Sequence, residues 1–176
     1  MMSFLGCGSN NSINNIVSPH VIQKSNKMAQ KSRPKVFLGG ACNPTTWRRD
    51  IAIPFLIDAG TVDFYNPQVD TWSADLMDKE DAEKESAEVL LFVFTHDTRG
   101  QATLVEAAYY IGKGRDVVLV LDEYNPEQTI SIEEKKDMNR GRVYLREMAK
   151  LNKIVVCDTI HNAMVEVLKK LLKTSL

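Results

Sequence analysis

The stretch VLLFVFTHDTRGQATLVEAAYYIGKGRDVVLVLD, residues 89–122, decides the fold class. It begins and ends with largely apolar runs, 89–95 and 116–122, in which polar and apolar residues do not alternate. Runs of this kind are typical of strands that are buried on both faces of a sheet. Between them a polar loop is followed by a helix-forming segment, residues 100–114. The stretch therefore predicts a strand, a crossover helix and a second strand parallel to the first.

The same alternation continues on both sides of this stretch. Further strands are predicted at 35–40, 62–67 and 153–158, and further helices at 45–60, 73–88, 142–151 and 160–174, with a charged connection at 123–141. Strands interleaved with helices predict an α/β, three-layer, doubly wound domain with about five parallel strands. We assign residues 34–176 to this domain. Residues 1–33 are rich in Ser and Asn without a helical or strand period, and we expect them to form a flexible leader.

Composition excludes several classes of function. The net charge of −1 gives no basic surface for nucleic acid, so we expect no nucleic-acid partner. Cys7, Cys42 and Cys157 lack the spacing of a zinc site or a disulfide framework, which favours a reducing, cytoplasmic location and no metal. No apolar run approaches the roughly 18 residues of a membrane span, so no membrane association is expected.

In a doubly wound sheet, ligands bind at the carboxyl ends of the strands, which directs attention to the loops there. Gly39 and Gly40 end the first strand and would let a ligand approach the backbone, although a tight turn needs glycine as well. Trp47 could either stack on a base or pack on the sheet. Arg48 could bind a phosphate. Asn66 either faces the same crevice or forms an Asn-Pro turn.

The loop and helix after the third strand carry the strongest candidates. Asp97 is either an acid–base group or a turn residue, and Arg99 is a candidate anchor for a phosphate or carboxylate. Glu106 is nearly the only polar residue between Gln101 and Gly112, so it has little solvated helix face to join. The alternatives are a solvent-exposed Glu and an ionised carboxylate that faces a crevice. The second would be a competent nucleophile toward an anomeric carbon, with Tyr109 as a candidate neighbour.

These segments resemble the nucleoside 2-deoxyribosyltransferase superfamily, in particular its deoxyribosyltransferase-like branch. The resemblance covers about residues 35–122 and rests on FLGG, the Trp-Arg helix start, YNP and TRG followed by EAA. It implies a flavodoxin-like fold, a homo-oligomer (dimer or larger), and cleavage of N-glycosidic bonds of deoxynucleosides or deoxynucleotides without a cofactor. Two alternatives remain open: a non-catalytic module that senses nucleotides, and a glycohydrolase of NAD-like dinucleotides.

The resemblance also implies roles for individual residues. Glu106 would attack C1′ of the sugar to form a covalent deoxyribosyl-enzyme, Asp97 would assist the leaving base, and Glu80 or Asp81 would supply a further acid. The residues that would contact the substrate are Gly39, Gly40, Trp47, Arg48, Asn66, Arg99, Gly100 and Tyr109. One departure concerns the aromatic hydroxyl that contacts the nucleophile in the family. Phe37 has none, so Tyr109 or Tyr110 would have to provide it.

Overall fold

A five-stranded sheet forms the centre of the fold in the computed structural model, which describes residues 33–71 and 73–174. All of its strands are parallel, in the order β2-β1-β3-β4-β5. The strands are β1 (Lys35–Gly40), β2 (Asp63–Tyr65), β3 (Val89–Phe94), β4 (Val117–Leu121) and β5 (Val155–Cys157). This arrangement confirms the predicted doubly wound α/β fold. The predicted leader lies, apart from residue 33, outside the described residues.

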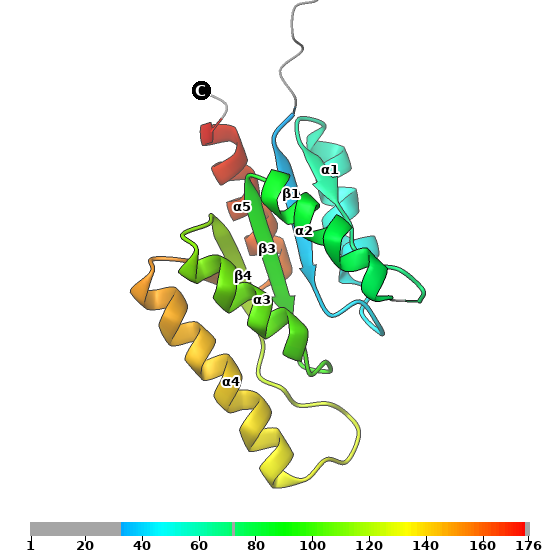
Figure 1. Cartoon of the computed structure of the whole chain (residues 1–176), viewed down its shortest axis with the longest axis vertical. Coiled ribbons are helices and arrows are strands. Elements are labelled where there is room, and N and C mark those ends of the chain that lie inside the picture. The colour runs from blue at the N-terminus through cyan, green and yellow to red at the C-terminus, as the bar shows by residue number, and fades with distance from the viewer. Residues whose placement is uncertain (1–32, 72, 175–176) are drawn as a thin grey trace, which may run out of the picture. The chain divides into compact units, whose positions relative to one another are not determined.

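Helices cover both faces of this sheet (Figure 1). They are η1 (Arg48–Ala52), α1 (Ile53–Ala59), η2 (Ala74–Leu76), α2 (Met77–Ser86), α3 (Gln101–Gly112), α4 (Ile132–Leu151) and α5 (Ile160–Thr174). Side chains that alternate along β3 explain the two layers of core. Leu91 and Val93 pack with residues of η1, α1 and α5, whereas Leu90 and Phe92 pack with residues of α3 and α4. All six residues of β3 are buried, as its unbroken apolar run predicts.

The helix α4 is the main difference from the predicted elements. We predicted a charged connection over 123–141 and a helix only from 142, but α4 begins at Ile132. Ser131 caps it, because its hydroxyl accepts a hydrogen bond from the backbone N–H of Glu134 at 3.0 Å. The charged residues of this segment belong to the solvated face of a helix rather than to a loop. Among the described residues, no helix is long and apolar enough to cross a membrane.

Candidate functional site

A cavity of about 670 Å³ opens at the carboxyl ends of the strands. It lies where the strand order reverses, between β1 and β3, which is the position where such sheets bind ligands. Three loops line it: the one after β1, the one after β3 and the one after β4. Its lining residues include Asn43, His96, Asp97, Arg99, Gly100, Tyr124 and Gln128. The predicted residues Asp97, Arg99 and Gly100 therefore lie together at this cavity.

Arg142, on α4, holds two of these loops in place. It is buried, and its guanidinium donates to the backbone carbonyls of Asp122 at 2.5 Å and of Thr98 at 2.5 Å. A third bond reaches the carbonyl of Thr95 at 3.1 Å. Burial lowers the pKa of Arg142. The sequence prediction missed this residue, because nothing in the sequence distinguishes it from other Arg residues in a charged helix.

Arg99, at the mouth of the same cavity, already has a partner. Its guanidinium donates two hydrogen bonds to the Glu134 carboxylate, at 3.0 Å and 2.7 Å. This contact joins the loop after β3 to the first turn of α4. The side chain remains 64% exposed. An anion that bound there would have to compete with Glu134 for the guanidinium.

The loop after β1 is built around Arg48, which is fully buried. Its guanidinium donates to the carbonyls of Leu38 at 2.8 Å, Gly40 at 2.8 Å and Ala41 at 3.0 Å. Burial lowers its pKa to about 10. Trp47 is also buried, and its ring lies 4.4 Å from the Arg48 guanidinium carbon. Both residues were predicted to contact the substrate, but the structure uses them to support the loop, because neither side chain reaches the surface.

Gly39 and Gly40 are required by packing within the sheet. A Cβ atom on Gly39 would lie 2.4 Å from the ring of Phe92 on β3. A Cβ atom on Gly40 would lie 2.7 Å from the carbonyl oxygen of Val93, and Gly40 has a φ of 140°. Close contact between β1 and β3 therefore explains both glycines without a ligand.

Asn66 forms a turn, which is the second of the two alternatives that the sequence left open. Its side-chain oxygen accepts a hydrogen bond from the backbone N–H of Gln68 at 3.0 Å. The turn directs the Gln68 amide to the loop after β1, where it donates to the carbonyls of Cys42 at 2.5 Å and Thr45 at 3.0 Å. The loops after β1 and β2 are thereby joined.

Glu106 lines a different and smaller hollow, of about 260 Å³. The other residues around it are Asp81, Glu85, Val105, Tyr109 and Tyr110, which come from α2 and α3. Asp97, by contrast, lines the larger cavity, and neither hollow is lined by both acids. We expected the Glu106 carboxylate to point into the main cleft. It faces instead the groove between two helices, because α2 supplies its partner.

That partner is Lys84, whose side chain is only 2% exposed. Its ammonium lies 2.6 Å from Oε1 of Glu106, 3.3 Å from Asp81 and 3.8 Å from Glu80. It also lies 5.3 Å from the centre of the Phe37 ring. Burial by itself lowers the pKa of Lys84, but its contacts with Glu106 and Asp81 outweigh burial and raise the pKa above its ordinary value. Sequence reasoning did not select Lys84, which lies in a highly charged helix.

The acids that share this ammonium differ in their exposure. The Glu80 side chain is 16% exposed and that of Asp81 is 64% exposed. Burial raises the pKa of Glu80; the nearby charges of Glu106 and Asp81 raise it further, and those of Lys84 and Arg48 oppose them. Two neighbouring acids whose surroundings differ in this way can take the separate roles of nucleophile and proton donor. Of the two acids predicted near position 80, Glu80 has the more suitable surroundings.

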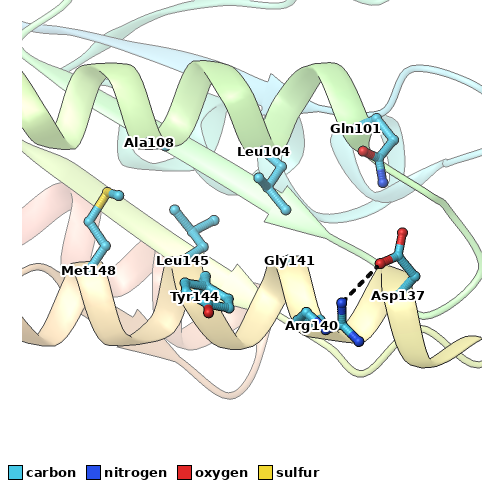
Figure 2. Close-up of a pocket in the computed structure, with 9 residues that line it drawn as sticks. All are labelled: Gln101, Leu104, Ala108, Asp137, Arg140, Gly141, Tyr144, Leu145 and Met148. Atoms are coloured by element: carbon cyan, nitrogen blue, oxygen red, sulfur yellow. Dashed lines mark ion pairs between the residues drawn. The ribbon is translucent and has the colours of Figure 1, made fainter.

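A third hollow, of about 290 Å³, separates α3 from α4 (Figure 2). Leu104, Leu145 and Met148 form its apolar part, and the ion pair between Asp137 and Arg140 lies at one end. Apart from those two paired side chains, the phenol of Tyr144 is the only ionisable group in its lining. We therefore place the candidate chemistry at the other two hollows.

Part of the chain matches a known protein family. Residues 33–124 match the family described as "nucleoside 2-deoxyribosyltransferase like". The chain belongs to this family. The match covers β1 to β4, together with Glu80, Lys84, Asp97 and Glu106.

Solved structures support the fold of this deoxyribosyltransferase-like protein. A conserved protein from Enterococcus faecalis V583 superposes with a TM-score of 0.50 at 16% identity, over 82% of this chain and 100% of the other. At that identity the similarity concerns the fold alone. A comparison with curated protein sequences gives no match.

Proposed function

We propose that this protein cleaves or transfers the N-glycosidic bond of 2-deoxynucleosides or deoxynucleotides, with Glu106 as the nucleophile. Family membership supports the class of reaction. The single observation that carries the proposal is the contact of 2.6 Å between the Glu106 carboxylate and the buried ammonium of Lys84. An adjacent ammonium keeps a carboxylate ionised, and an ionised carboxylate is the form that attacks an anomeric carbon.

The proposed reaction has two steps, as in glycosidases that retain configuration. In the first, a Glu106 oxygen bonds to C1′, the bond from C1′ to the base nitrogen breaks, and the base leaves with a proton. In the second, water or another base attacks C1′, gives its proton to Glu80 and releases the Glu106 carboxylate. We assign the proton of the first step to Glu80, whose raised pKa keeps it protonated to higher pH than an ordinary Glu. The reaction needs no metal or organic cofactor.

We assign Asp97 to the assistance of the leaving base from the larger cavity, whose volume of about 670 Å³ is of the size that small-molecule ligands occupy. The substrate would then extend from the Glu106 hollow toward the carboxyl ends of β1 and β3. A homo-oligomer remains part of the proposal, and light scattering of the purified protein would test it.

A second candidate function has its own support. The bond between Glu106 and Lys84 also serves as an ion pair that joins α2 to α3 without any reaction. A protein that binds nucleotides without cleaving them would have no need to break that contact. Such a sensor would gain thermal stability with a nucleotide and release no base. A glycohydrolase of NAD-like dinucleotides is the third candidate and would release nicotinamide.

One experiment separates these candidates. The full chain is incubated with deoxynucleosides, their 5′-monophosphates and NAD, and free base is measured by chromatography for the wild type and for Glu106→Gln. The matched control is Glu83→Gln, because Glu83 lies on α2 but bonds to Lys35 at 2.7 Å, outside the Lys84 cluster. We expect release by the wild type and the control, and a loss of at least about a hundredfold in Glu106→Gln. Equal release by all three proteins would overturn the proposed nucleophile.

A further inference from the structure

Lys84 occupies a position where an apolar residue would be the ordinary choice. Its side chain is 2% exposed and lies over the Phe37 ring, which is itself buried. Burying a cation is costly unless it is paired, and a well-packed apolar residue is often at least as stabilising. Packing therefore does not account for a lysine here. The acids around the ammonium do, because Glu80, Asp81 and Glu106 all lie within 3.8 Å of it.

We propose that Lys84 is a positioning residue that keeps the Glu106 carboxylate ionised and fixed in orientation, and that it compensates the charge of Glu80 once that acid has given up its proton. This inference rests on the proposed function. The sequence led us to expect a tyrosine hydroxyl from Tyr109 or Tyr110 as the donor to Glu106. The donor that the structure provides is Lys84, from a different helix.

Charge balance explains why a cation suits both stages of the reaction better than a hydroxyl. In the form that reacts in this proposal, Glu106 is negative and Glu80 carries the proton, so the ammonium pairs with Glu106. After attack, Glu106 is a neutral ester, and the proton of Glu80 has left with the base. The negative charge has then moved to Glu80, which lies 3.8 Å from the same ammonium. Lys84 thus remains paired throughout, and the summed charge of the three groups does not change.

Lys84 itself does not act as the nucleophile. An amine attacks only after losing its proton, and the acids around Lys84 hold that proton on. The ionisable groups that face the cluster come from three elements. They are Glu80, Asp81, Lys84 and Glu85 of α2, Arg48 of η1, and Glu106, Tyr109 and Tyr110 of α3, with Lys113 beside Glu85.

The test compares Lys84→Met, Lys84→Arg and Glu106→Gln with the wild type in the assay of base release, over a range of pH. We expect Lys84→Met to lower kcat by about 10- to 100-fold with little change in KM, because the lost charge acts on the nucleophile. The acid limb of its pH–rate profile should move to higher pH, because a carboxylate that has lost its ammonium partner is more easily protonated. Lys84→Arg keeps the charge, so its acid limb should lie at the same pH as that of the wild type. A purely structural role would lower the amount of folded protein without moving that limb.

The outcomes separate the two proposals. Absence of base release by the wild type, or full activity in Glu106→Gln, overturns the proposed function and this inference together. Wild-type activity that Glu106→Gln abolishes, but that Lys84→Met retains within about twofold with an unmoved acid limb, overturns the role of Lys84 alone. If Lys84→Met melts below the assay temperature, Lys84→Gln is measured instead. It keeps a donor and loses the charge, so its acid limb should still move, and an unmoved limb overturns the inference.

Discussion

The ammonium of Lys84 lies 2.6 Å from the carboxylate of Glu106, although the two residues are 22 positions apart and belong to different helices. The contact joins α2 to α3 and defines the groove that holds the candidate nucleophile. It also groups the acids around a single buried cation. Several consequences of this grouping and of the loops beside it can be measured.

Glu80 should make stability depend on pH in an unusual direction for an acid. Burial raises its pKa above the ordinary value of 4.5. A raised folded-state pKa stabilises the fold below the unfolded pKa, and this contribution is lost as pH rises through the folded pKa. Glu80→Gln should therefore have a higher Tm than the wild type at neutral pH, and the advantage should shrink as pH falls toward 4. Thermal melts from pH 4 to 8 measure it, and a variant less stable at neutral pH would contradict the assignment.

Glu85, on the same helix, should behave in the opposite way. Its hydrogen bond from Lys113 lowers its pKa. Stability from a lowered pKa is present above the unfolded pKa and is lost as pH falls through the folded pKa. Glu85→Gln should therefore be less stable than the wild type at neutral pH, and the two should converge in acid. The same melts provide the comparison. Curves of Tm against pH that run parallel to the wild-type curve in both variants would show that neither pKa differs between the folded and unfolded states.

Arg48 should be essential to stability because it satisfies three backbone carbonyls from a fully buried position. Arg48→Met removes the side-chain donor to the carbonyls of Leu38 and Gly40, while Ala41 keeps its hydrogen bond from the Thr45 hydroxyl. The substitution should cost at least about 3 kcal/mol of unfolding free energy. Arg49→Met is the control, since the side chain of Arg49 is 75% exposed and should change stability by less than about 0.5 kcal/mol. Urea denaturation measures both. Equal midpoints for the two variants would refute the structural role of Arg48.

Gly39 should tolerate no side chain, because a Cβ atom there would lie 2.4 Å from the Phe92 ring. Gly39→Ala should lower the free energy of unfolding by about 1 to 3 kcal/mol, since the rigid strand cannot move away from the ring. At Gly112, the last residue of α3, an added Cβ meets nothing within 4 Å. Gly112→Ala should leave the free energy of unfolding unchanged or raise it by up to about 1 kcal/mol. Denaturant midpoints that fall equally in both variants would argue against this packing.

Physical reasons explain why the fold was more predictable than the site. The unbroken apolar runs at β3 and β4 are typical of strands buried on both faces, and right-handed crossovers between such strands give a doubly wound sheet. The start of α4 was predicted ten residues late. Ser131 and Glu134 form a capping pattern there, but the charges between Glu133 and Asp137 obscured the helical period.

The site depended on contacts between elements that local sequence does not encode. Among the candidate residues, Asp97, Arg99 and Gly100 do line one cavity. Lys84 and Arg142 look like ordinary surface residues in charged helices, and their burial arises only when α2 meets α3 and α4 meets the loops. Arg48 was interpreted as a ligand contact because we did not expect a buried cation beside two glycines.

The separation of acids between two hollows predicts different kinetic effects. Glu80→Gln removes the proposed proton donor and should lower kcat by about a hundredfold or more. Asp97 is exposed in the larger cavity, and Asp97→Asn should raise KM with a smaller effect on kcat. Steady-state kinetics with a single deoxynucleoside measure both parameters. The reverse pattern, with kcat lost in Asp97→Asn and kept in Glu80→Gln, would identify Asp97 as the proton donor instead of Glu80.

The most direct measurement of the central claim is mass spectrometry of a trapped deoxyribosyl-enzyme. A nucleoside with fluorine at C2′ slows the second step, because fluorine disfavours positive charge at C1′. Tryptic cleavage after Arg99 and Lys113 releases the peptide 100–113, in which Glu106 is the only acidic side chain. We predict a sugar adduct on this peptide in the wild type and none in Glu106→Gln. Base release by the wild type with the adduct on another peptide would contradict the account.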